Sequence, residues 1–208
     1  MRIVLLSGFL GSGKTSLLLP FAMYLKDVSR RDTGTAVVII ENEIGSVSID
    51  GATLRAGGLE VRELIAGCIC CNLADDLSLT IQEIRELYDP EWLIIEATGL
   101  AIPSEIEAEI RSCRGLDASV SSLVVVDASR FIKLIAFNDR MIRRQLEGAT
   151  TILLNKIDLV DEGTKQQIVR TLGELQPGVA IIEMAATCTI EPAVWKMLLA
   201  SPVPSITR

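Results

Sequence analysis

An eight-residue stretch near the start of the chain does most to limit what the chain can fold into. Residues 8–15 read GFLGSGKT, which fits the phosphate-binding pattern G-x-x-x-x-G-K-[ST]. The apolar residues 3–7 before it predict a strand, and the pattern over residues 14–26 predicts a helix. Between a strand and a helix, the glycines let backbone N–H groups turn toward a phosphate. We therefore predict a P-loop, whose nucleotide contacts come from Gly8, Gly11, Ser12, Gly13, Lys14, Thr15 and Ser16.

Two P-loop residues and a later acidic element are predicted to bind Mg²⁺ and the β and γ phosphates of the nucleotide. The Lys14 ammonium would neutralise oxygens of the β and γ phosphates, and the Thr15 hydroxyl would bind Mg²⁺. Glu96 ends the run EWLIIE, and Gly99 follows after two spacers. This spacing is typical of the metal and switch element of GTPases, in which the carboxylate holds Mg²⁺ through water and the glycine amide senses the γ-phosphate.

The tetrapeptide at residues 155–158, NKID, predicts the base. It closes the apolar run TILLN some 140 residues after the P-loop. Asp158 can accept from two guanine N–H groups, a donor pair that adenine lacks. Asn155 can reach the guanine N7, and the Lys156 stem can lie over the ring. We predict guanine, with Ala185 and Ala186 as backbone donors to its O6.

Short apolar runs alternate with helical patterns along the whole chain, which is typical of parallel βαβ units. We therefore predict an α/β fold, a mostly parallel central sheet with helices on both faces, as in three-layer P-loop NTPases. We expect residues 1–208 to form one domain, because the chain has no linker or repeat. The long connection 43–71 is expected to hold a small hairpin of 53–54 with 59–64. Strands are predicted at 3–7, 36–41, 92–96, 122–126, 151–155 and 179–183, and helices at 14–26, 73–88, 104–112, 139–147, 161–172 and 191–199.

Composition excludes several functions. The formal charge is −7, from 27 acidic and 20 basic residues, and no dense basic run offers a surface for nucleic acid or an anionic membrane. No apolar stretch reaches the ~20 residues of a membrane-spanning helix, and we expect a cytoplasmic protein. The chain has no histidine, which removes the commonest metal ligand and the commonest general base from any mechanism.

Three of the five cysteines are packed into residues 67–72, which read GCICCN. Asn72 is a good N-cap for the next helix, and a helix N-terminus lowers the pKa of nearby thiols, which favours thiolate ligands. Three cysteines leave a tetrahedral metal shell incomplete, and such a shell suits metal transfer. A structural or regulatory metal, redox chemistry and simple burial are the alternatives. Cys113 and Cys188 are predicted to be core residues.

Taken together, these motifs resemble those of the CobW-type metallochaperone GTPases. This group belongs to the SIMIBI class of P-loop GTPases, with the hydrogenase and urease nickel-insertion GTPases. The resemblance implies GTP hydrolysis coupled to delivery of a divalent metal, often zinc or cobalt. The matching stretches are SGFLGSGKT at 7–15, IENEIGSVSID at 40–50, ELIAGCICCNL at 63–73, IIEATGLAIP at 94–103 and LLNKIDLV at 153–160.

The resemblance also implies residue roles. The catalytic set would be Lys14, Glu43, Glu96 and Gly99, with Glu43 joining Thr15 and Glu96 at the magnesium or the catalytic water. The cargo metal would be held by Cys68, Cys70 and Cys71, with assistance from Glu41. Relatives of this group often pair as nucleotide-linked homodimers, and the client would be a metalloprotein or a corrinoid enzyme.

Three departures from the family pattern affect what can be inferred. Ile44 and Ser46 stand where many relatives have an aromatic residue and a second acid, so one carboxylate ligand is missing. We expect residues 1–208 to lack the C-terminal domain of many relatives, and the sequence has no histidine-rich stretch. Two alternatives therefore stay open, a GTP-dependent maturation or reactivation factor for a cobalamin or corrinoid enzyme and a metal-sensing regulatory GTPase. Without a histidine base, we expect slow intrinsic turnover.

Overall fold

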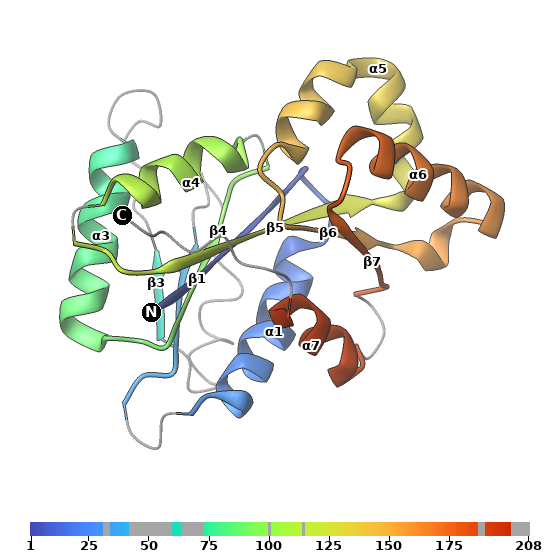
Figure 1. Ribbon diagram of the computed structural model, residues 1–208. Coiled ribbons are helices and arrows are strands. Elements are labelled where there is room, and N and C mark those ends of the chain that lie inside the picture. Colours follow the sequence, from blue (N-terminus) through green and yellow to red (C-terminus); the bar gives the residue numbers. More distant parts are fainter. Residues whose placement is uncertain are drawn as a thin grey trace.

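The computed structural model describes residues 1–30, 34–41, 60–63, 73–99, 101–113, 115–186 and 190–200. These residues contain a seven-stranded sheet in the order β3-β2-β4-β1-β5-β6-β7, and every neighbouring pair is parallel (Figure 1). The strands are β1 (Arg2–Gly8), β2 (Val37–Glu41), β3 (Glu60–Glu63), β4 (Trp92–Glu96), β5 (Ser119–Asp127), β6 (Thr151–Asn155) and β7 (Ala180–Glu183). Because parallel strands end at one edge, the loops after them are brought together there.

Helices cover both faces of the sheet, as predicted (Figure 1). The helices are α1 (Lys14–Val28), α3 (Leu73–Tyr88), α4 (Pro103–Ser112), α5 (Ala128–Leu146), α6 (Glu162–Leu175) and α7 (Pro192–Ala200), and a short 3₁₀ turn, η1, covers Ile157–Leu159. Helices α1 and α7 lie on one face, where the ring of Trp195 stacks on Phe21 with centroids 5.3 Å apart. Helices α3, α4, α5 and α6 lie on the other face.

The burial of the strands shows that the sheet is the central layer of the fold. All five residues of β2, Val37–Glu41, are buried, and so are six of the seven in β1. Strands that read as continuous apolar runs are typical of sheets covered on both sides. The predicted three-layer α/β architecture is confirmed. No helix in the described part of the chain is both long enough and apolar enough to cross a bilayer.

Two predicted elements differ from the structure. The stretch 59–64 was expected to be one arm of a hairpin, but Glu60–Glu63 pair in parallel with β2 as an edge strand. The other arm, 53–54, lies outside the described residues. Helix α5 begins at Ala128, whereas the pattern predicted a start at 139. Asn138 interrupts the helix with φ −151° and ψ 73°, so the sequence pattern revealed only the part after this break.

Candidate nucleotide and metal site

The P-loop between β1 and α1 has a left-handed backbone conformation at Gly13, which glycine adopts without strain. Gly13 has φ 102°, and a Cβ at this position would lie 2.3 Å from Asn155 Nδ2. Any other residue here would be strained and would collide with that amide. The Lys14 ammonium donates to the carbonyls of Gly8, at 2.8 Å, and Phe9, at 3.2 Å, so its side chain curls back over the loop.

The loop offers polar groups that suit an anion. Lys14 is buried although it carries a positive charge, and burial of a charge is costly without compensation. The Ser12 hydroxyl is also buried, and it has no hydrogen-bond partner among the described residues. A buried ammonium and an unpaired hydroxyl in one loop, at the N-terminus of α1, are donors that suit a phosphate group.

The two predicted magnesium residues in the described chain are in contact. The Thr15 hydroxyl donates to Glu96 Oε1 at 3.1 Å, which joins the start of α1 to the end of β4. Glu96 is in register with Glu41 at the end of β2, and Glu41 is in register with Glu63 at the end of β3. Three glutamates thus end three adjacent strands at the edge where the P-loop lies.

The segment after Glu96 packs closely on the P-loop. The Ala101 N–H donates to the Thr98 carbonyl at 3.1 Å, which closes a turn around Gly99. A Cβ at Gly99 would lie 2.6 Å from the backbone nitrogen of Leu10. Because real Cβ atoms do not approach so closely, this position requires glycine, and the predicted switch glycine lies directly against the P-loop.

Asn155 connects the P-loop to the loop after β7. Its Nδ2 donates to the Ser12 carbonyl at 2.8 Å, and its Oδ1 accepts from the Ala186 N–H at 2.8 Å. The side chain is almost fully buried. Asn155 therefore braces two loops that lie 31 and 143 positions away in sequence, a role that the motif alone does not reveal.

Lys156 lies across the outside of the P-loop. Its backbone is left-handed, with φ 62°, and its ammonium donates to the Gly11 carbonyl at 2.6 Å and to Asp127 Oδ2 at 2.7 Å. Asp127 ends β5 in register with Asn155, and its other oxygen accepts from the Ser129 N–H as the N-cap of α5. Asp127 belongs to none of the motifs from which the site was predicted. An acidic residue after an apolar run, LVVVD at 123–127, was the signal available.

The other predicted nucleotide residues of the described chain lie in segments that follow these motifs or β7. Asp158 lies in η1 and is exposed, Ser16 is exposed in the first turn of α1, and Ala185 and Ala186 follow β7. Cys113 is buried, as predicted. The predictions for Glu43, Cys68, Cys70, Cys71 and Cys188 lie outside the described residues. Among the described residues no three cysteine or acidic side chains converge as a metal site.

The fold and this site define a P-loop GTPase domain. The model of the CobW/HypB/UreG nucleotide-binding domain matches residues 2–183, and the chain belongs to this family, whose members are GTPases. A similar curated protein is the zinc chaperone CobW of Sinorhizobium sp., with 32% identity over 75% of this chain and 51% of the relative. The chain thus spans about half the length of the curated relatives it matches.

Solved structures support the same assignment. The zinc-bound YjiA GTPase of E. coli is 26% identical, with a TM-score of 0.53 over 83% of this chain and 54% of that one. HypB of Helicobacter pylori, in a complex with nickel, has a TM-score of 0.64 over 95% of this chain and 83% of that one. Because the identity is only 18%, the HypB structure supports the fold alone.

Proposed function

We propose that this protein hydrolyses GTP and thereby controls the delivery of zinc, bound by Cys68, Cys70 and Cys71, to a client protein. The nucleotide half of the proposal rests on the P-loop and on the contacts around it. The zinc half rests on the cysteine cluster and on the strands that lead to it.

For the nucleotide, the proposal assigns the phosphates to the P-loop amides and Lys14. Thr15 and Glu96 would hold Mg²⁺, with Glu43 as a further candidate, and the ion would neutralise charge on the β and γ phosphates. Gly99 would sense the γ-phosphate, since it already lies against Leu10 of the loop.

For the base, Asp158 would accept from the two guanine N–H groups. The Lys156 stem would cover the ring, with its ammonium held between Gly11 and Asp127. The Ala186 amide is engaged by Asn155, so Ala185 is the better candidate for the donor to guanine O6. These assignments predict selectivity for guanine over adenine nucleotides.

One observation supports coupling between the two halves. The cysteines belong to the connection between β3, which ends at Glu63, and α3, which begins at Leu73. The end of β3 is in register with Glu41, which is in register with Glu96, the proposed magnesium residue. Adjacent strands of a sheet lie about 4.8 Å apart, so β3 and β4 are separated by about 10 Å. The cysteine connection thus starts at the edge that carries the nucleotide site.

Zinc is favoured as cargo for two reasons. Thiolates are soft ligands that suit zinc, and three of them leave a fourth position for a carboxylate such as Glu41 or for a group of the client. Curated relatives are named zinc chaperones, although the chain matches only about half of their length. Cobalt also accepts such ligands and serves as the competing ion. A client, or a second copy of the chain bound through nucleotide, would accelerate a slow intrinsic hydrolysis.

The test is a zinc titration against a chromophoric chelator, with a non-hydrolysable GTP analogue, with GDP and without nucleotide. The comparison protein is the triple variant Cys68→Ala, Cys70→Ala, Cys71→Ala, and Cys113→Ala is the matched control because Cys113 is buried in the core. We expect the affinity for zinc to change about tenfold between GTP analogue and GDP, a coupling of about 1.4 kcal/mol, and to vanish in the triple variant only.

Other outcomes would contradict the proposal. Equally tight zinc binding in every nucleotide state would indicate a metal-sensing regulatory GTPase. Equal zinc binding by wild type and the triple variant would mean that the cysteines hold no cargo. The corrinoid-enzyme alternative would then be tested by binding to a corrinoid protein. Tighter binding of Co²⁺ than of Zn²⁺ would contradict zinc as the cargo, but it would leave the coupling to GTP in place.

A further inference from the structure

A glutamine on α5 makes hydrogen bonds to residues 98–101, which follow Glu96 and are called the switch segment here. Gln145 Nε2 donates to the Gly99 carbonyl at 3.0 Å and to the Ala101 carbonyl at 3.2 Å. Gln145 lies 46 positions after Gly99, one residue before the end of α5. None of the sequence motifs includes this residue.

The switch segment is therefore held by two separate supports. Gly99 lies so close to Leu10 that a Cβ would reach within 2.6 Å of the Leu10 nitrogen. Gln145 binds two carbonyls of the segment. Leu10 belongs to the P-loop and Gln145 to a packed helix, so both supports are fixed to the body of the domain.

The chemistry fixes how the Gln145 amide is oriented. Both of its contacts are carbonyl oxygens, which only accept, so the NH₂ group must face the segment. The amide oxygen is then turned away, and it is buried without a partner in the described part of the chain. A buried, unpaired oxygen costs about 1–3 kcal/mol, and an apolar side chain would avoid that cost. The two hydrogen bonds to the switch are what this position gains from a glutamine.

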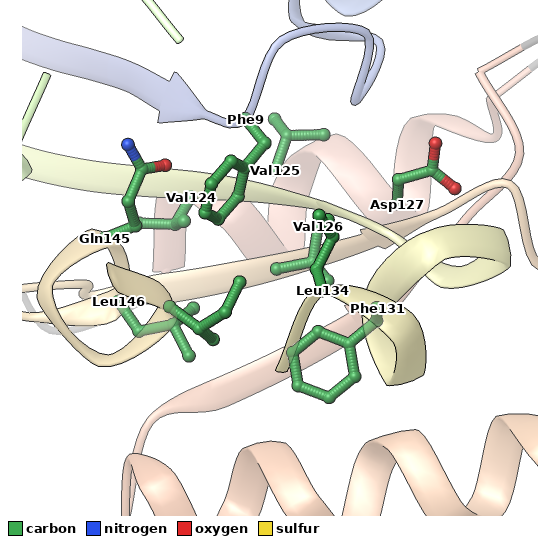
Figure 2. Close-up of a pocket in the computed structure, with 10 residues that line it drawn as sticks. Phe9, Val124, Val125, Val126, Asp127, Phe131, Leu134, Gln145 and Leu146 are labelled. Carbon is green, nitrogen blue, oxygen red and sulfur yellow. The ribbon is translucent and has the colours of Figure 1, made fainter. Parts of the chain in front are cut away.

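Gln145 also borders a cavity beneath the P-loop. The cavity encloses about 20 Å³, which is room for a water molecule and too little for a ligand. Phe9 of the P-loop lines the same cavity, and Figure 2 shows the Gln145 amide and the Phe9 ring on the β1 side of it, with Phe131 at the far end. Gln145 thus binds the switch segment and borders the same cavity as the side chain of a P-loop residue.

We infer that Gln145 is a positioning residue for the γ-phosphate response, which it exerts through Gly99. This inference rests on the role proposed above for Gly99. By holding the Gly99 and Ala101 carbonyls, Gln145 keeps the segment in one arrangement before GTP arrives. Without Gln145, part of the binding energy of the γ-phosphate is used to order the segment. The apparent affinity for GTP is then the intrinsic affinity multiplied by the fraction of molecules in the competent arrangement. GDP has no γ-phosphate and is bound without this contribution.

The test measures the affinities of the full chain for GDP and for a non-hydrolysable GTP analogue with Mg²⁺ and without zinc. The variant Gln145→Met keeps the length of the side chain and removes the donor. We expect about a tenfold loss of affinity for the GTP analogue and less than a twofold change for GDP. The control Gln167→Met makes the same chemical change on the exposed surface of α6 and should alter neither affinity.

A second control separates positioning from packing. Leu146→Ala damages the core beside Gln145 but keeps its amide, so it should lower the Tm while the ratio of the two affinities stays as in wild type. If Gln145→Met weakens GDP and the GTP analogue equally, or leaves both unchanged, the inference is wrong. If that variant does not bind GDP, Gln145→Glu replaces it in the same titration, because it keeps the shape and turns the donor into an acceptor. Since no zinc is present, the result does not depend on the cargo proposal.

Discussion

The Thr15 hydroxyl donates a 3.1 Å hydrogen bond to the Glu96 carboxylate, although the two residues are 81 positions apart in sequence. The contact exists because β1 and β4 are neighbours, with Leu6 of β1 in register with Glu96. Thr15 and Glu96 are the two described residues proposed to hold Mg²⁺. Their adjacency makes the end of β4 the point where the proposed nucleotide and magnesium sites would meet the switch segment.

The first prediction concerns this contact. Glu96→Gln removes the charge that would attract Mg²⁺ but keeps the size of the side chain. We expect the Mg²⁺ concentration required for half-maximal binding of the GTP analogue to rise at least tenfold, as is usual when a carboxylate of a metal shell is lost. The control Glu91→Gln alters a glutamate that directly precedes β4, where it accepts from the Ser29 hydroxyl at 2.7 Å, and should leave that Mg²⁺ concentration unchanged. An unaltered Mg²⁺ titration of the first variant would refute the assignment.

The second prediction concerns the base. Asp158→Asn replaces a pure acceptor with a side chain that also donates, so it no longer matches the two donor N–H groups of guanine. Hydrogen bonds to a charged group contribute about 1.5–3 kcal/mol, so GDP affinity should fall about 10- to 100-fold. Xanthine nucleotides carry an oxygen in place of the exocyclic amine. Their affinity, relative to that of guanine nucleotides, should therefore rise in this variant. Asp161→Asn, at the N-cap of α6, is the control; equal losses in the two variants would contradict the assignment.

The third prediction concerns the partner of Lys156. Asp127→Asn removes the charge that holds the Lys156 ammonium at 2.7 Å, while one side-chain oxygen remains to cap α5. We expect affinities for GTP analogue and GDP to fall by a similar factor, about three- to tenfold, because the base is common to both. Asp139→Asn, which breaks the exposed pair with Arg143, should have no such effect. A lower Tm with unchanged nucleotide affinity would show that Asp127 serves the helix alone.

The fourth prediction compares two glycines. Gly99→Ala would place a Cβ 2.6 Å from the Leu10 nitrogen, so the switch segment must move away from the P-loop. We expect GTP-analogue affinity to fall more than GDP affinity. Gly173→Ala meets nothing within 4 Å, and within α6 it should stabilise the fold by about 0.4–1 kcal/mol without altering nucleotide binding. Unchanged GTP-analogue binding by Gly99→Ala would remove Gly99 from the proposed mechanism.

The fifth prediction concerns pH and stability. Burial, together with the nearby charge of Glu105, raises the pKa of Glu109 above its ordinary value. The folded state therefore binds this proton more tightly than the unfolded state, and stability falls as the pH rises through the folded pKa. Glu109→Gln should raise the Tm at neutral pH, and the gain should disappear below the ordinary carboxyl pKa of about 4.3. A gain of equal size at both pH values would point to another cause.

Much of the nucleotide site could be predicted because its residues are local in sequence. The motif at residues 8–15 carries its own strand and helix, and NKID follows a strand, so both could be assigned without knowing the sheet order. The parallel sheet followed from the alternation of strands and helices. The contact between Thr15 and Glu96 was implied by their separate roles at magnesium, although its geometry required the order of the strands.

The missed features depend on contacts that no local pattern records. Asp127 becomes significant only because β5 and β6 are adjacent, in a register that brings it beside the NKID turn. Gln145 looks like any polar residue near a helix end, and only the packing of α5 on the switch segment reveals its partners. The start of α5 was missed because the run from 130 to 137 is apolar enough to resemble a strand, and the break at Asn138 divides the helical pattern.

The most direct test of the account is a single-turnover experiment that follows GTP hydrolysis and zinc release together. Protein loaded with zinc and GTP is mixed with Mg²⁺ and a fluorescent chelator, and phosphate and zinc are recorded in parallel for wild type and Glu96→Gln. We predict that zinc reaches the chelator at the rate of phosphate formation, and that both steps are slowed in the variant and with a non-hydrolysable analogue. Zinc release at one rate, whether or not GTP is cleaved, would contradict the coupling of hydrolysis to metal delivery.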